Sequence, residues 1–155
     1  MRVLGVDYGR RRIGLAVSDA SGMLARPWKT IARVGNPGQV AGSIVAEVNA
    51  LGREDQSIGV IVIGYPRRLN GEPNEQTAAV EQMADSLRRL VEIPLVLQDE
   101  RLSSHEADGL LARSQKDWRR RKAQLDAMSA AVILQDYLDS DGARDIGRQR
   151  EDSET

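Results

Sequence analysis

One continuous apolar run, from Ile58 to Tyr65, limits this chain to a small set of folds. The run is rich in β-branched residues and has no polar face, which is typical of a strand buried on both sides. We therefore expect it in the centre of a sheet that helices cover on both faces. It is far too short to cross a bilayer, and Met1 leads directly into a predicted strand without a charged and apolar leader. A soluble, cytoplasmic protein is the expectation.

The chain opens with a predicted β-hairpin over residues 3–19. Two apolar runs each end in an acid, Asp7 and Asp19, and the turn between them contains Gly9 and three arginines. Asp is uncommon in strands, so Asp7 either begins a turn or has a functional role as a carboxylate. Alternation along the strand places two sets of side chains on opposite faces: Val3, Gly5 and Asp7 on one, Leu4, Val6 and Tyr8 on the other.

The rest of the chain alternates predicted helices and strands. Apolar residues spaced three or four apart indicate the helices, short apolar runs indicate the strands, and turn residues mark the boundaries between them. The expected elements are a strand over residues 23–33, a helix over 36–51, a strand over 58–65, a helix over 74–91, a strand over 94–98, and helices over 103–113 and 122–138. This order predicts an α/β fold, a mixed five-stranded sheet flanked by helices. We expect one domain over residues 1–138 and an acidic, flexible tail over residues 139–155.

The net charge of −1 hides an uneven distribution of charge. Basic residues gather at 10–12, at 67–68 and in the segment 113–122, which we expect to be a loop. Clustered positive charge is the electrostatic footprint of a polyanion binder, although a basic loop can also be only a solvated segment. The chain has no cysteine, which excludes disulfides, cysteine–zinc sites and thiol nucleophiles. Any metal must therefore bind oxygen ligands or the single histidine, His105.

Three acids have mainly apolar surroundings. Asp7 and Glu100 each end a predicted strand, and Asp126 shares a helix face with apolar residues four and seven positions later. If the two strands lie near each other and the helix packs across their ends, the three carboxylates converge. Each acid also has a structural interpretation: a turn for Asp7, a surface pair with Arg101 for Glu100, and a favourable helix-dipole position for Asp126.

Converging carboxylates favour a divalent cation, since they repel one another strongly unless a cation lies among them. Hard oxygen ligands suit Mg²⁺ or Mn²⁺, and a pair of such ions can activate water and stabilise a leaving oxygen in phosphodiester cleavage. This chemistry needs no side-chain nucleophile. The sequence contains no Walker loop, dinucleotide-binding glycine fingerprint or serine elbow that would indicate another mechanism.

Several neighbouring residues keep two interpretations. His105 can be a ligand or an exposed residue of a capping turn, and Arg101 can contact phosphate or brace the site. Trp118 can stack on a base or dock on its own core. The segment 64–71 places Arg67 in a loop after the buried strand, where open mixed sheets bind ligands.

Four motifs in order, taken together, resemble the YqgF family, also called RuvX, over residues 3–138. They are residues 7–19, residues 64–66 with Gly71, residues 99–104 and residues 126–135. The resemblance implies a ribonuclease H-like fold, with the family's acids on Asp7, Glu100 and Asp126. The chain departs from the usual pattern at Arg10 to Arg12, Tyr65 and Ser103, which concerns substrate contacts and not the acids.

The resemblance also implies a function, a metal-dependent hydrolase that cleaves nucleic-acid phosphodiesters and leaves 5′-phosphate and 3′-hydroxyl ends. Members of this family are described as nucleases that mature the 5′ end of 16S ribosomal RNA and as Holliday junction resolvases. Precursor rRNA is the favoured partner, branched DNA and ribosomal particles are others, and the chain acts as a monomer or homodimer away from membranes. Two Mg²⁺ or Mn²⁺ ions are implied, with Asp7, Glu100 and Asp126 as catalytic and metal ligands. The expected nucleic-acid contacts are Arg10, Arg11, Arg12, Arg67, Arg101, Arg119, Arg120, Arg121 and Lys122.

Two other functions remain as alternatives. A phosphate-binding hairpin of the actin and sugar-kinase type also places Asp-x-Gly between two strands, but such ATPases need two related lobes, which this length does not supply. A non-catalytic RNA-binding or ribosome-assembly protein could keep the fold. Metal-dependent cleavage that is lost in Asp7→Asn while RNA binding persists would distinguish an enzyme from a binder.

Overall fold

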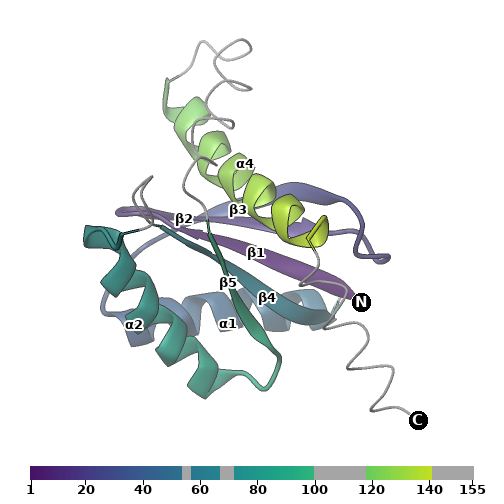
Figure 1. Cartoon of the computed structure of the whole chain (residues 1–155), viewed down its shortest axis with the longest axis horizontal. Helices are drawn as coiled ribbons and strands as arrows, with labels where there is room; N and C mark the ends of the chain where they lie inside the picture. Colours follow the sequence, from purple (N-terminus) through teal and green to yellow (C-terminus); the bar gives the residue numbers. More distant parts are fainter. Residues whose placement is uncertain (54–56, 67–71, 100–117, 141–155) are drawn as a thin grey trace.

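The computed structural model describes residues 1–53, 57–66, 72–99 and 118–140 of the chain (Figure 1). None of the helices within these ranges is long and apolar enough to cross a membrane. In chain order, the described elements are β1 (Arg2–Tyr8), β2 (Arg12–Ser18), β3 (Ala25–Ala32), α1 (Pro37–Arg53), β4 (Ile58–Tyr65), α2 (Glu75–Leu90), β5 (Leu95–Asp99) and α4 (Trp118–Leu138).

The strands form one mixed five-stranded sheet in the order β3-β2-β1-β4-β5. The three strands β1 to β3 are an antiparallel meander, and β4 and β5 continue the sheet parallel to β1. This confirms the predicted α/β architecture. The apolar run forms β4, an interior strand next to the centre of the sheet, because the strand order places β1 in the middle. The carboxyl ends of β1, β4 and β5 therefore lie along the same edge of the sheet.

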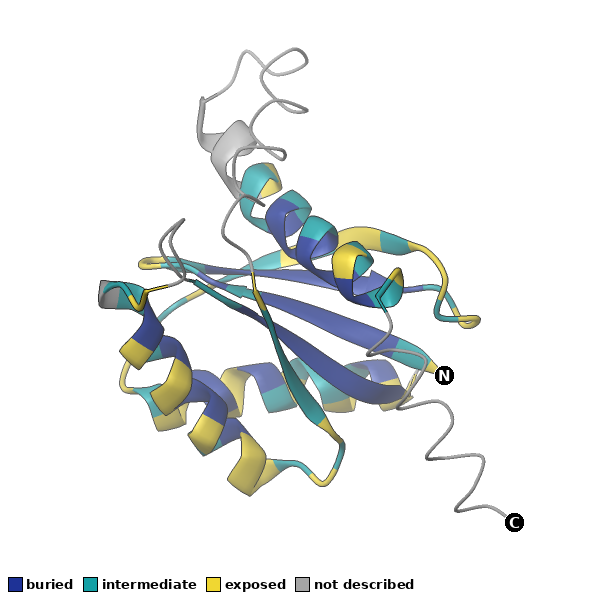
Figure 2. Ribbon diagram, in the orientation of Figure 1, coloured by how far each residue is buried: buried dark blue, intermediate teal, exposed yellow. Residues whose placement is uncertain are grey.

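Helices cover both faces of the sheet, with α1 and α2 on one face and α4 on the other (Figures 1 and 2). The alternation predicted for β1 is confirmed by two separate cores. Leu4, Val6 and Tyr8 pack with α1 and α2, whereas Val3 packs with α4. Burial on both faces explains why β4 is apolar throughout. The side chain of Asp7 consequently belongs to the α4 face.

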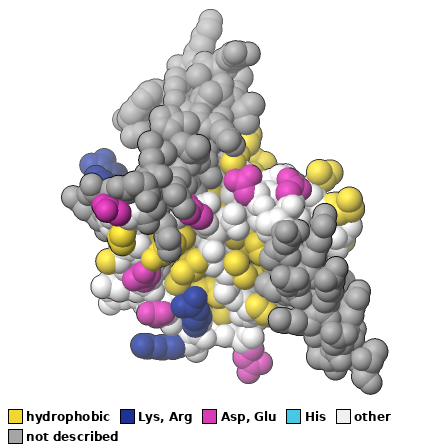
Figure 3. Space-filling model, in the orientation of Figure 1, with side chains coloured by type: hydrophobic (Ala, Val, Ile, Leu, Met, Phe, Trp, Pro, Cys, Tyr) yellow, Lys and Arg dark blue, Asp and Glu magenta, His cyan; other side chains and the backbone are white. Residues whose placement is uncertain are grey.

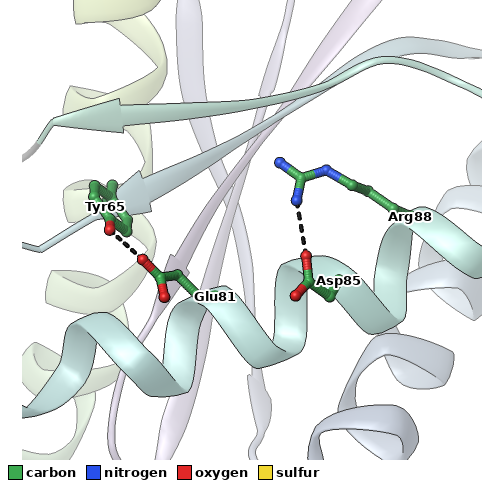
Figure 4. A network of polar contacts seen from close by, with 4 residues as sticks. All are labelled: Tyr65, Glu81, Asp85 and Arg88. Carbon is green, nitrogen blue, oxygen red and sulfur yellow. Dashed lines mark hydrogen bonds and ion pairs between the residues drawn. The ribbon is translucent and has the colours of Figure 1, made fainter.

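The N-terminus of α2 is tied to the carboxyl end of β4. Asn74 caps the helix by accepting hydrogen bonds from the backbone of Gln76 and Thr77. The Thr77 hydroxyl donates to the Pro66 carbonyl at 2.7 Å, and the Tyr65 hydroxyl hydrogen-bonds to Glu81 on α2 (Figure 4). This predicted helix is confirmed to within one residue at each end, and its cap places β4 and α2 in a defined relation.

Another exposed pair on the same helix, Asp85 and Arg88, spans one turn at 3.0 Å (Figure 4). On the face seen in Figure 3, the lysine and arginine side chains of the described residues lie at separate places among acidic and apolar ones and form no continuous patch. A basic surface patch therefore does not mark the candidate functional residues on this face, and we identify them by their position in the fold.

One prediction about the basic segment is wrong. The helix expected to begin at Lys122 begins at Trp118, so Arg119, Arg120 and Arg121 lie in the helix and not in a loop. Arginine and lysine have favourable helix propensities, so the helix can extend through a charged segment that lacks an apolar stripe. Several other predictions, including Arg67, Glu100, Arg101, His105, the helix over residues 103–113 and the tail beyond residue 140, lie outside the described residues.

Candidate active site

Asp7 lies near the carboxyl end of the central strand, with its side chain on the face that α4 covers. Across the antiparallel ladder, it is directly paired with Gly14 of β2. Gly14 is in turn paired with Thr30 of β3. A row of residues on adjacent strands therefore runs from the candidate catalytic acid toward the edge strand, with a glycine at its centre.

Glycines allow α4 to lie directly on the strands beside Asp7. A Cβ atom on Gly14 would lie 1.9 Å from the backbone oxygen of Asp126, and one on Gly5 would lie 2.9 Å from that of Ala130. Both distances are shorter than any real contact of a Cβ atom, so the helix can approach this closely only where the strands carry no side chain. The contact at Gly14 brings Asp126 next to Asp7.

The two carboxylates interact electrostatically. Burial and, as the smaller cause, the negative charge of Asp126 together raise the pKa of Asp7 from 3.8 to about 7. Asp126 is partly compensated by Arg12, whose Nε lies 2.9 Å from the buried Oδ2 of that carboxylate. Paired carboxylates of this kind, held in a protein interior, are typical of sites that accept a cation or exchange a proton.

The raised pKa of Asp7 predicts how stability depends on pH in the metal-free protein. Between pH 4 and 7 the folded state holds a proton that the unfolded state has released, so stability falls as the pH rises through this window. The expected loss is about 2 to 4 kcal/mol relative to Asp7→Asn, which removes the titration. Urea unfolding in EDTA at pH 5 and pH 8 measures it. Parallel pH profiles for the two proteins would contradict the burial of Asp7 as an acid.

A small cleft lies beside Asp126 at the turn between β1 and β2. The turn is closed by the Gly9 backbone N–H, which donates to the Arg12 carbonyl at 3.0 Å. The cleft has a volume of about 270 Å³, and its lining consists of Gly9, Arg10, Arg11, Arg12 and Asp126. The three predicted phosphate contacts of this turn therefore lie at the mouth of the candidate site.

Arg33, which sequence reasoning missed, supports this turn from the opposite face of the sheet. Its Nη1 donates to the Gly9 carbonyl at 3.0 Å, and its guanidinium lies 4.0 Å from the centre of the Tyr8 ring. Its backbone N–H also donates to the Arg11 carbonyl. No periodicity or motif marked Arg33, because its role depends on the pairing of β2 with β3.

The other acid of the hairpin, Asp19, has a structural role. Its carboxylate accepts hydrogen bonds from the backbone of Met23 and Leu24 and from the Ser21 hydroxyl. These bonds, first among them that from Met23, lower the pKa of Asp19. Nearby, the Gln135 amide of α4 accepts from the Ala25 backbone at 2.9 Å. Asp19 thus orders the turn between β2 and β3, and Gln135 holds that turn to α4.

Two of the three predicted carboxylates therefore meet in the structure, and Glu100 lies outside the described residues. Within the described ranges, no three histidine, aspartate or glutamate side chains gather as a ready metal site. The donor chemistry of Asp7 and Asp126 nevertheless fits a divalent cation, because both offer hard oxygen atoms and each disfavours the charge of the other. A second cleft, of about 460 Å³, is lined by residues of β3 and α4, which include Trp28, Thr30, Gln124 and Met128.

Comparison with known proteins places the chain in a family. The family model described as "RuvX: Holliday junction resolvase" matches residues 1–140. The chain belongs to the RuvX family. A relative from Roseiflexus sp. (strain RS-1), named "Putative pre-16S rRNA nuclease", is 38% identical over 139 residues, which cover 90% of this chain and 94% of the relative. One of the same name from Bacillus thuringiensis (strain Al Hakam) is 36% identical over 140 residues, covering 90% and 99%.

This RuvX chain was also compared with solved structures. A RuvC structure from Thermus thermophilus is similar over 88% of this chain and 95% of the RuvC chain, with 16% identity and a TM-score of 0.49. The mixed sheet of the RuvX chain, an antiparallel meander followed by parallel βα units, is the ribonuclease H-like arrangement that the sequence resemblance implied.

Proposed function

We propose that this RuvX protein is a metal-dependent nuclease that hydrolyses phosphodiesters in precursor 16S rRNA. The observation that carries the proposal is the meeting of Asp7 and Asp126 beside a cleft lined by arginines. The names of the relatives and of the family model support a nuclease. Membership of the family also favours this function over the sugar-kinase type of ATPase, which the hairpin alone left open.

Asp7 and Asp126 are the proposed ligands of the cation, with Glu100, the residue after β5, as the third. When bound, Mg²⁺ or Mn²⁺, in our proposal as two ions, supplies an activated water and a positive charge near the leaving oxygen. Asp7 would hold the cation from the central strand β1, and Asp126 would hold it from α4. The P–O3′ bond breaks as the water oxygen bonds to phosphorus, which leaves 5′-phosphate and 3′-hydroxyl ends.

The turn that carries Arg10, Arg11 and Arg12 is the proposed contact for the substrate backbone. Guanidinium groups bind phosphate through paired, charge-assisted hydrogen bonds, so three arginines at the cleft would orient a phosphodiester toward Asp126. Such contacts position the backbone without reading its sequence. Arg67 and Arg101 are also proposed contacts for the nucleic acid, because in the sequence they follow β4 and β5.

The basic start of α4 is a further proposed contact, and its effect should be electrostatic. Replacing Arg119, Arg120, Arg121 and Lys122 together by Gln should weaken binding to all RNA sequences and lower the slope of log affinity against log salt by up to about 3. Arg88→Gln with Arg89→Gln, on the opposite side of the sheet, is the matched control and should leave the slope unchanged. Filter binding across a salt series measures both, and an unaltered slope in the first variant would remove this segment from the interface.

The experiment that tests the function compares two substrates. Purified protein with Mn²⁺ is incubated with precursor 16S rRNA and, separately, with a synthetic four-way DNA junction. We expect cleavage of the RNA to give the 5′-phosphate end. Preferential, symmetric cleavage of the junction would instead support the resolvase, the second candidate that the description of the family model favours. RNA binding without cleavage of either substrate would support an assembly protein.

The two nuclease candidates also differ in oligomeric state and in partners. A resolvase that cuts two strands symmetrically acts as a dimer, whereas a nuclease that trims one end can act as a monomer. Ribosomal particles are the proposed partner of the nuclease that trims one RNA end. Light scattering of the protein alone and with each substrate therefore complements the cleavage assay.

A further inference from the structure

Arg12 pairs with the carboxylate that the proposed function assigns to the cation. The Nε atom of Arg12 lies 2.9 Å from the Asp126 Oδ2, and the two side chains are 34% and 27% exposed. Both residues line the cleft, and the backbone of Arg12 closes the turn with Gly9. A partly exposed cationic group thus lies on a buried carboxylate oxygen at the cleft where the proposed function places the substrate.

A guanidinium and a divalent cation compete for the same carboxylate. Metal coordination uses the oxygen lone pairs that the guanidinium faces, and two positive groups on one carboxylate repel each other. Without another anion, Arg12 therefore favours the metal-free state. A phosphodiester in the cleft changes this balance because it offers the guanidinium a second anionic partner with matching geometry.

We propose that Arg12 is a positioning residue that couples the cation to the nucleic acid: it covers Asp126 in the free protein and moves to the substrate phosphate when the cation binds. This inference rests on the proposed function. Because such coupling is reciprocal, nucleic acid should tighten cation binding by the same factor by which the cation tightens nucleic-acid binding. The free enzyme would then hold its cation weakly and complete its site only on substrate.

Arg11 provides a matched control for the charge of Arg12. It is in the same turn and lines the same cleft, but its side chain is exposed, whereas that of Arg12 reaches Asp126. Gln at either position removes one positive charge at nearly the same place. A general electrostatic effect on the cation should therefore appear in both variants, and a direct competition only in Arg12→Gln.

The experiment measures Mn²⁺ affinity by electron paramagnetic resonance of the free ion, with and without a phosphorothioate RNA that resists cleavage. Without RNA, Arg12→Gln should bind Mn²⁺ about tenfold more tightly than the wild type, and Arg11→Gln less than about threefold more tightly. RNA should tighten Mn²⁺ binding about tenfold in the wild type, within the usual range for coupled sites, and less than about twofold in Arg12→Gln. Arg12→Lys, which keeps the charge, should retain part of the coupling.

The outcomes separate this inference from the proposed function. Asp126→Asn gives the background of Mn²⁺ on the RNA, and thermal unfolding confirms that each variant is folded. If Mn²⁺ binding is the same in the wild type and in Asp126→Asn, the proposed metal site is wrong. If binding depends on Asp126 but Arg12→Gln resembles Arg11→Gln, or binds Mn²⁺ more weakly than the wild type, the coupling role of Arg12 is overturned while the nuclease proposal stands.

Discussion

Asp7→Asn is expected to lower Mn²⁺-dependent RNA cleavage on the order of 10³-fold or more, with RNA affinity within about twofold of the wild type. The asparagine has the same shape but offers one neutral oxygen, so the variant loses a charged ligand that no neighbouring residue replaces. In the proposed function, the Asp7 carboxylate would hold the cation while the arginines of the turn would hold the substrate backbone, so RNA binding should persist. Single-turnover cleavage and filter binding measure the two quantities.

Asp19→Asn is the matched control because Asp19 ends the other strand of the same hairpin. Its carboxylate caps the turn before β3, and an asparagine oxygen can still accept the backbone hydrogen bonds from Met23 and Leu24. We expect cleavage near the wild-type rate in this variant. Asp7→Asn should also gain stability above pH 7, since it removes a buried charge. Full cleavage by folded Asp7→Asn would contradict the proposed role, as would an equal loss of cleavage in folded Asp19→Asn.

The second large effect is expected from Gly14→Ala, a change of one methyl group. Its Cβ would collide with the backbone oxygen of Asp126 at 1.9 Å, and a backbone cannot rotate aside as a side chain can. We expect α4 to be displaced, with a loss of about 3 kcal/mol in the free energy of unfolding and roughly 6 to 12 °C in the melting temperature. Cleavage should fall more than stability explains, because Asp126 moves away from Asp7.

Gly42→Ala tests whether this loss is specific to the site. Gly42 is exposed in α1, and a Cβ there meets no atom within 4 Å. Alanine is the better helix former, so this variant should gain up to about 1 kcal/mol with unchanged cleavage. Calorimetry and the cleavage assay on both variants give the comparison. Equal stability changes would show that the close approach of α4 does not depend on Gly14.

Much of the fold could be predicted from periodicity alone. The apolar run of β4 required cover on both faces, and the alternation in β1 correctly assigned Asp7 to the face opposite Leu4 and Val6. The end of a helix is harder to predict when charge replaces the apolar stripe, which is why α4 begins at Trp118 and not at Lys122. Helix propensity acts on every residue, whereas periodicity is visible only where one side is buried.

The two described acids of the site could be selected from the sequence, because carboxylates beside apolar residues are costly to bury without a partner. The sequence could not identify Arg12 as the ion-pair partner of Asp126. Only the packing of α4 on Gly14 places Asp126 beside Asp7, and only the turn between β1 and β2 turns Arg12 toward that carboxylate. Local sequence decides which face of an element is apolar, but the closest approach of two elements depends on side-chain volumes from both, which meet only in the folded chain.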